Sequence, residues 1–338
     1  MENSETSSKK TSIHYVPFVL IFGVICILLL NFFQKGNKNI SQKAAVTTPI
    51  RIAYPALGTV IAGQVGSIFQ KTDILKNNGL QATVTSMNTG KEMKVALVGG
   101  QVDAIFTSES NFVVLLGQGF PCYAIASFGT DGKVGLAVNP DSDIKTVADL
   151  KNKKIGTLFG TSVHRPAVQW AKDAGLTPGK DVEIVNFGGA DALRTALQAK
   201  QIDAITTWDP YLIDGVNKNI HREIISADLD LIIVVSKEYA DKNPESIKRL
   251  KLALKETALY MSQNKTQVNN WYSEIGKLDA SLINQSSGSN INYNISKLED
   301  ADISISPSLI EKLVNQSEFL YAEKLIQQKP EIGPYIQQ

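Results

Sequence analysis

The chain is poor in the residues that build metal sites and disulfides. Its 338 residues include only two cysteines, Cys26 and Cys122, and three histidines, and neither a CxxC nor an HExxH spacing occurs. A zinc site or a catalytic nucleophile is therefore not indicated, and we expect no metal, no cofactor and no catalytic residues. Cys26 lies in an apolar run and Cys122 precedes a strand-like segment, so we predict no disulfide and a buried thiol at Cys122.

An excess of charge of either sign is also missing. Lysine and arginine together number 34 and aspartate and glutamate 33, which leaves a formal net charge of +1. Nucleic-acid-binding domains usually carry a basic face, so no nucleic-acid partner is expected. The length suits roughly two lobes of 100 to 200 residues each.

One long apolar run lies near the N-terminus. The 19 residues from Tyr15 to Phe33 contain no charge, and a helix needs roughly 20 apolar residues to cross a bilayer. We predict an uncleaved transmembrane signal anchor at 15–34, preceded by a cytoplasmic tail at 1–14. A cleaved signal is the alternative, because Lys43-Ala44-Ala45-Val46 offers a weak cleavage site.

The residues around this run give less information. Lysines flank both of its ends, so the positive-inside rule does not orient the segment. Residues 35–49 are polar and hold few bulky apolar groups, which predicts a flexible linker.

From Ile50 onward, strand-like runs alternate with helix-like runs, which predicts parallel sheets covered by helices. Residues 94–107 and 194–207 align without a gap at an offset of 100 and share the strand start Q-(V/I)-D-A-I. This period is too long for a solenoid and indicates two similar α/β lobes. Ligands of such sheets bind beyond the carboxyl ends of the strands, so we expect function in a cleft between the lobes.

Strand-like passages at 122–128 and 134–138, separated by a predicted turn at 129–132, suit a crossing between the lobes. Residues 231–235 are the best candidate for the return. Helical patterns are predicted near 60–77 and 91–99 and over 244–271 and 307–328. The predicted division is lobe 1 at 50–128, lobe 2 at 129–232, and a return to lobe 1 with C-terminal helices at 233–338.

Three segments carry a family resemblance: DLKNKKIG at 149–156, GTSVHRPAVQWAKDAGL at 160–176 and QIDAITTWDPY at 201–211. In this order and spacing they resemble the substrate-binding proteins of ABC importers for nitrate, taurine, alkanesulfonates and thiamine precursors. The resemblance covers roughly residues 50 to 330. It implies a two-lobed periplasmic-binding-protein type II fold, in which each lobe is a mostly parallel sheet with helices on both faces and two crossover strands join the lobes. It also implies an extracytoplasmic location.

Two basic residues stand at the start of the helix predicted in GTSVHRPAVQW. His164 and Arg165 add positive charge where the helix dipole is already positive, which favours an anionic ligand held by Thr161, Ser162 and spare N–H groups. The resemblance supports His164, since family members often carry histidine there, whereas Arg165 departs from the family. The alternatives are that Thr161 and Ser162 only cap the helix and that Arg165 is a solvated side chain.

Further ligand contacts are predicted in the loops that follow strands. Glu109 either neutralises a ligand ammonium, which favours a zwitterion, or pairs with Arg165 across the cleft, or is an exposed carboxylate at a helix start. Trp208 offers a large face that can cover a ligand, whereas Asp209 before Pro210 is expected to cap a helix. The other predicted contacts are Tyr54, Leu57, Asn88, Thr89, Ser108, Phe187 and Gly188.

The sequence therefore predicts a monomeric, single-pass membrane protein whose extracytoplasmic domain captures a small anionic or zwitterionic solute, such as a sulfonate, nitrate or a taurine-like molecule. Lobe closure would hold the solute for delivery to an ABC permease and its ATPase. One alternative is a tethered ligand sensor without a transporter. A second is an enzyme like the thiamine-pyrimidine synthases, which is less favoured because their cysteine-rich motif is missing. A cleaved, secreted or periplasmic form is the alternative to membrane attachment.

Overall fold

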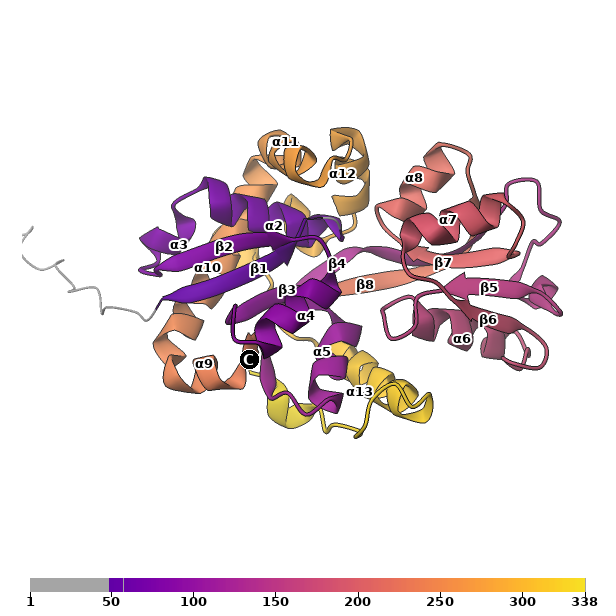
Figure 1. Ribbon diagram of the computed structural model, residues 1–338. Helices are drawn as coiled ribbons and strands as arrows, with labels where there is room; N and C mark the ends of the chain where they lie inside the picture. The colour runs from indigo at the N-terminus through magenta and orange to yellow at the C-terminus, as the bar shows by residue number, and fades with distance from the viewer. Residues whose placement is uncertain (1–48, 57, 338) are drawn as a thin grey trace, which may run out of the picture. The chain divides into compact units, whose positions relative to one another are not determined.

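Figure 1 shows the computed structural model, which describes residues 49–56 and 58–337. The predicted cytoplasmic tail, the predicted transmembrane segment at 15–34 and all but the last residue of the predicted linker lie outside these residues, as does Leu57. Among the helices of the described part, none has the length and apolar character that crossing a bilayer requires.

The described strands form one mixed sheet in the order β2-β1-β3-β8-β4-β7-β5-β6. Strands β2, β1 and β3 are parallel at one end of the sheet, and β7, β5 and β6 are parallel at the other. Between them β8 and β4 pair antiparallel. The bounds are β1 (Ile50–Pro55), β2 (Ala82–Met87), β3 (Ala104–Ser108), β4 (Cys122–Val138), β5 (Lys154–Thr157), β6 (Glu183–Asn186), β7 (Ala204–Trp208) and β8 (Arg222–Ser236).

Strands β4 and β8 are the two crossovers between the lobes, and each pairs with β3 or β7 over only part of its length. The return over 231–235 is confirmed as part of β8. The predicted turn at 129–132 is wrong, because β4 continues through it with irregular pairing between Thr130 and Lys133. Gly129 and Gly132 have φ values of 82° and 84°, so their left-handed backbone forms bulges rather than a turn.

The helices agree with prediction in place but not always in length. The segment predicted near 60–77 divides into α2 and α3, and the one over 244–271 divides at Asn264 into α10 and α11. The helix predicted to reach residue 328 ends at Ala322. The bounds are α2 (Val60–Lys71), α3 (Ile74–Asn77), α4 (Gly90–Val98), α5 (Glu109–Gly117), α6 (His164–Asp173), α7 (Ala190–Gln198), α8 (Tyr211–Asn217), α9 (Lys237–Lys242), α10 (Pro244–Gln263), α11 (Lys265–Gly276), α12 (Ala280–Ser287) and α13 (Pro307–Ala322).

Each lobe has one apolar core on each face of the sheet. Strand side chains alternate between faces: in β1, Ile52 packs in the core that includes α2 and α10, whereas Ala53 packs with α4, α5 and α13. In lobe 2, one core includes α6 and the other α7 and α8. Figure 1 shows α4, α5, α13 and α6 below the sheet and α2, α11, α7 and α8 above it.

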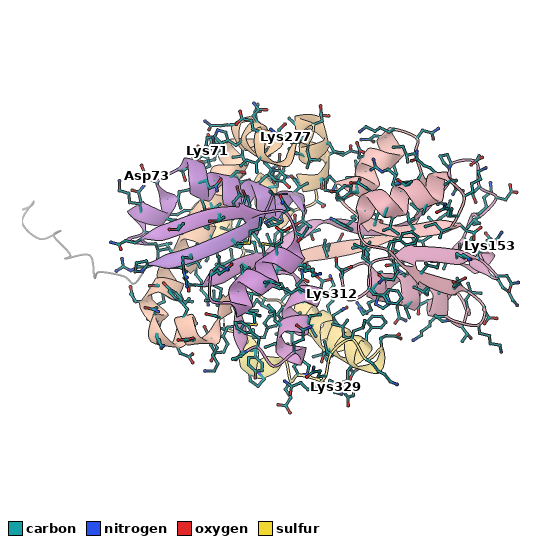
Figure 2. All side chains as sticks on the ribbon, in the orientation of Figure 1. Lys71, Asp73, Lys153, Lys277, Lys312 and Lys329 are labelled. Atoms are coloured by element: carbon teal, nitrogen blue, oxygen red, sulfur yellow. The ribbon has the colours of Figure 1, made fainter. Side chains whose placement is uncertain are left out.

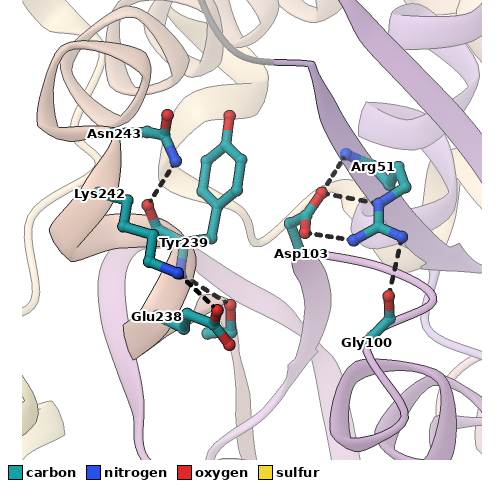
Figure 3. Close-up of polar contacts among 8 residues, drawn as sticks. Arg51, Gly100, Asp103, Glu238, Tyr239, Lys242 and Asn243 are labelled. Atoms are coloured by element: carbon teal, nitrogen blue, oxygen red, sulfur yellow. Dashed lines mark hydrogen bonds and ion pairs between the residues drawn. The ribbon is translucent and has the colours of Figure 1, made fainter.

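The 100-residue repeat has one structure in both lobes, since α4 leads to β3 as α7 leads to β7. In lobe 1 the Asp103 carboxylate accepts hydrogen bonds from the backbone N–H of Arg51 at 2.8 Å and from its guanidinium at 2.7 Å (Figure 3). In lobe 2 the Asp203 carboxylate accepts one from the N–H of Lys154 at 2.9 Å. The repeated aspartate thus fixes the start of a central strand in each lobe.

Candidate functional site

The lobes meet where the start of α5 approaches the loop before α6. The Ser110 hydroxyl donates a hydrogen bond to the Gly160 carbonyl at 3.4 Å, and the Gln316 side chain on α13 donates to Ser110 Oγ at 3.1 Å. Helix α13 packs along α5. The candidate site is therefore built by α5 and α13 of lobe 1 and by α6 of lobe 2.

Glu109, the first residue of α5, carries a buried carboxyl at this junction. Burial and the neighbouring Asp230 carboxylate raise the pKa of Glu109 to about 7, although Lys312 and Arg165 act in the opposite direction. Glu109 Oε2 has no hydrogen-bond partner within the described part of the chain. The group is therefore poised to lose its proton when a cation or a hydrogen-bond donor approaches.

Charged side chains from three further elements surround this carboxyl. Lys312 of α13 forms an ion pair with Asp230 of β8, with Nζ 2.6 Å from Oδ2, and Figure 2 labels Lys312 beside the junction of the lobes. Arg165 of α6 acts on the Glu109 carboxyl through space, but the described residues offer it no ion pair within 4.0 Å. The structure thus brings Glu109 and Arg165 together without joining them directly.

His164 does not supply the positive charge that the sequence predicted. Its side chain is 2% exposed, lies stacked on Phe159 with ring centroids 4.2 Å apart, and meets the edge of Phe319 of α13 at 5.1 Å. Burial lowers the pKa of His164 to about 4, so the ring is neutral at pH 7. Its Nδ1 atom is buried without a partner in the described structure. His164 is therefore a neutral ring between the lobes.

The start of α6 also differs from the predicted one. The helix begins at His164 with Val163 as its N-cap, so neither Thr161 nor Ser162 is the capping residue. The Thr161 hydroxyl instead donates to the Leu158 carbonyl at 2.8 Å. Within the described chain, the backbone N–H groups of Ser162, Val163 and Arg165 make no backbone hydrogen bond. These N–H groups remain able to bind an anion.

Tyr54 is not at the cleft. Its ring is fully buried in the lobe 1 core, where it packs against Gly66 of α2, and its hydroxyl donates to Gln70 Oε1 at 2.8 Å. The sequence predicted Tyr54 at the cleft because it lies near the end of β1. Its side chain instead points into the core that β1 forms with α2 and α10. Leu57 lies outside the described residues.

Of the remaining predicted contacts, some lie close to the charged cluster around Glu109 and others do not. Ser108 is the N-cap of α5 and adjoins Glu109, and Trp208 packs in the small cluster that includes Val163 at the start of α6. Thr89 caps α4 by accepting from the Glu92 N–H at 3.2 Å. No described contact joins Asn88, Thr89, Phe187 or Gly188 to the charged cluster.

Asp209 precedes α8 but is not its N-cap. Pro210 is the N-cap of α8, and the buried Asp209 carboxylate accepts a hydrogen bond from the Lys133 N–H of β4 at 2.9 Å. The peptide bond between Asp209 and Pro210 is cis.

Six residues of the site were not predicted: Ser110, Phe159, Asp230, Lys312, Gln316 and Phe319. For Asp230 a signal exists, because Asp228 and Asp230 alternate with leucines in a strand pattern, which places two carboxylates on one face. Lys312 and Phe319 lie on a distant helix whose sequence is an ordinary amphipathic pattern, so only the tertiary fold identifies them.

A family model described as NMT1/THI5 like matches residues 70–267, more than half of the chain. A Brachyspira hyodysenteriae protein named as an ABC transporter periplasmic binding protein is 26% identical over 276 residues, which cover 75% of this chain and 77% of that protein.

Solved structures share the fold. The periplasmic aliphatic sulphonate binding protein SsuA from Escherichia coli superposes with a TM-score of 0.71 at 21% identity, over 86% of this chain and 92% of that one. The desulfurization enzyme DszB does so with a TM-score of 0.62 at 14% identity, over 85% and 96%. The chain therefore belongs to the NMT1/THI5-like family, and its resemblance to the substrate-binding proteins of ABC importers is confirmed.

Proposed function

We propose that the chain is an extracytoplasmic solute-binding protein that holds a small anionic or zwitterionic solute between its lobes and delivers it to an ABC permease with its ATPase. The observation that carries this proposal is the meeting of Glu109 from lobe 1 with Arg165 from lobe 2 in one partly buried cluster that leaves Glu109 Oε2 unpartnered. A solute of matching polarity would complete the cluster and draw the lobes together.

The two ends of such a solute would have different partners. The Arg165 guanidinium and the free N–H groups at the start of α6 suit a sulfonate or a similar oxyanion. The Glu109 carboxyl suits an ammonium or another N–H donor. An amino-sulfonate such as taurine meets both requirements, and the sulfonate specificity of the structural neighbour SsuA supports the anionic end.

Several features favour binding over catalysis. The one described cysteine, Cys122, is buried in the lobe 1 core, and its burial raises the pKa of the thiol, so it would react poorly. His221 is buried with Nε2 3.0 Å from the Leu212 carbonyl oxygen.

The segment at 15–34 would attach this monomeric domain to the membrane. A sensor without a transporter would use the same site.

A thermal-shift screen of the full-length chain tests this function. We expect taurine to raise the melting temperature more than ethanesulfonate or nitrate, and ethylammonium alone to raise it least, because only taurine carries both charges. At a large excess over its dissociation constant a solute stabilises by about 3 to 4 kcal/mol. If only neutral or purely cationic compounds stabilised the chain, the proposed function would be wrong.

A further inference from the structure

A cavity lies between the lobes on the face of the sheet opposite the Glu109 and Arg165 cluster. It has a volume of ≈320 Å³ and lies between α8 of lobe 2 and α12, which packs on α2 and α11 of lobe 1. Helix α8 belongs to the core on the α7 side, whereas α6 of the first site belongs to the core on the other side. The polar lining is Lys133, Asp209, Asn217, Glu223, Gln285, Ser286 and Ser289.

Two buried polar atoms in this lining lack partners. Asp209 is 1% exposed and Ser286 is 3% exposed, and neither Asp209 Oδ1 nor Ser286 Oγ finds a hydrogen-bond partner in the described part of the chain. Buried polar atoms of native proteins are nearly always satisfied, because an unsatisfied one is costly. These two atoms therefore call for a polar group inside the cavity.

The two side chains come from different lobes but converge on one point. A Cβ placed on Gly132 of β4 would lie 3.0 Å from Asp209 Oδ2 and 3.2 Å from Ser286 Oγ. The Asp209 carboxylate and the Ser286 hydroxyl therefore lie next to each other beside Gly132.

The chemistry of the lining selects the ligand. Asp209 supplies a carboxylate acceptor and Ser286 a hydroxyl acceptor, and the exposed Glu223 carboxylate and the exposed Lys133 side chain stand at the rim. The Gln285 amide oxygen is already used by Asn217, which donates to it at 3.0 Å. A negatively charged hydrogen-bond acceptor beside a hydroxyl suits a cation that donates hydrogen bonds. Leu212 and the half-exposed Val216 of α8 provide apolar wall beside them.

We propose that this cavity is a second ligand site, which binds a small primary alkylammonium ion. The ammonium donates hydrogen bonds to Asp209 Oδ1 and Ser286 Oγ, and the alkyl chain lies on Leu212 and Val216. Because Asp209 belongs to lobe 2 and Ser286 to an element packed on lobe 1, the bound ion bridges the lobes. This site is independent of the proposed solute at Glu109 and Arg165.

The ionisation of Asp209 should make binding of the ammonium ion depend on pH. Burial raises the pKa of Asp209 to about 6, the Lys133 and Ile213 N–H groups lower it, Glu223 raises it further and the Lys133 side chain lowers it. Asp131 of β4 is a further carboxyl close enough to interact with it. Since the ammonium needs an ionised carboxylate, its binding weakens as the pH falls through about 6.

Isothermal titration of the full-length chain with propylammonium chloride, in the absence of any sulfonate, tests the proposal. We expect one saturable site at pH 7.5 and none for the neutral analogue 1-propanol. Ser286→Ala should weaken binding about tenfold through the loss of one charge-assisted hydrogen bond, and Asp209→Asn should weaken it at least about tenfold. Ser304→Ala, at an exposed position outside the lining of this cavity, is the control.

The proposal fails if propylammonium does not bind, if Ser286→Ala binds it as tightly as Ser304→Ala does, or if affinity is unchanged between pH 5 and 7.5. Asp209→Asn also removes a charge from the contact with Lys133, so Ser286→Ala and the pH series decide the outcome if that variant does not fold. Ethanesulfonate carries no ammonium, so its titration on the same preparation reports the first site separately. Loss of propylammonium binding in Glu109→Gln but not in Ser286→Ala would place the ammonium at the first site and overturn the proposal.

Discussion

Replacement of Glu109 by glutamine should stabilise the chain at alkaline pH and leave it unchanged at acid pH. Burial and Asp230 raise the pKa of Glu109 from 4.5 to about 7 in the folded chain, so folding favours the protonated form. This contribution to stability is complete below pH 4.5 and is lost as the pH rises through 7. With about 1.4 kcal/mol for each pKa unit, the loss at pH 8 is roughly 3 kcal/mol. Glutamine does not ionise, so the variant does not lose this stability at alkaline pH.

Urea unfolding at pH 4.5 and pH 8 measures this difference. The Glu109→Gln variant should exceed the wild type by about 2 to 3 kcal/mol in unfolding free energy at pH 8 and match it at pH 4.5. Glu311→Gln, at an exposed position of α13, removes the same charge and should change little at either pH. An equal difference at both pH values, or none at pH 8, would refute the account of the buried carboxyl.

Two further outcomes follow from the packing. The ring of His164 should stay neutral from pH 5 to 8 in a ¹⁵N NMR titration, because burial lowers its pKa to about 4; a midpoint above 6 would show that the ring is solvated. Gly66→Ala should lower the unfolding free energy by about 1 to 3 kcal/mol, since a Cβ there would lie 2.1 Å from the Tyr54 ring. Gly188→Ala, which meets nothing within 4 Å, should cost no more than about 0.5 kcal/mol, and equal losses would contradict the packing.

Much of the fold could be predicted because its signals are local. The stretch that ends in Asp103-Ala104-Ile105 and its counterpart at Asp203 carry a helix end, a turn and a strand start within 14 residues, and the structure repeats all three. The predicted turn at 129–132 failed because glycine permits a positive φ in a bulge as readily as in a turn. Only the pairing of β4 with β8 distinguishes the two cases.

The site was predicted in part. The positions of its residues along the chain follow from local sequence, whereas the charge states of their side chains do not. Glu109 is the first residue of α5 and Arg165 the second of α6, and both positions at helix starts are where the pattern placed them. The neutrality of His164 depends on Phe319, which lies far away in sequence. Tyr54 occupies an equally suggestive position but points into the core. Side-chain direction and distant neighbours are set by tertiary packing, so a single sequence leaves them open.

The most direct test of the central claim is isothermal titration of the full-length chain with taurine, comparing the wild type with Arg165→Ala and Lys172→Ala. Both variants remove one positive charge from α6, but Lys172 is exposed in its last turn. We predict one site per wild-type chain, at least about tenfold weaker binding for Arg165→Ala through the loss of a charge-assisted contact, and unchanged binding for Lys172→Ala. Equal affinity in all three proteins would contradict a solute held between Glu109 and Arg165.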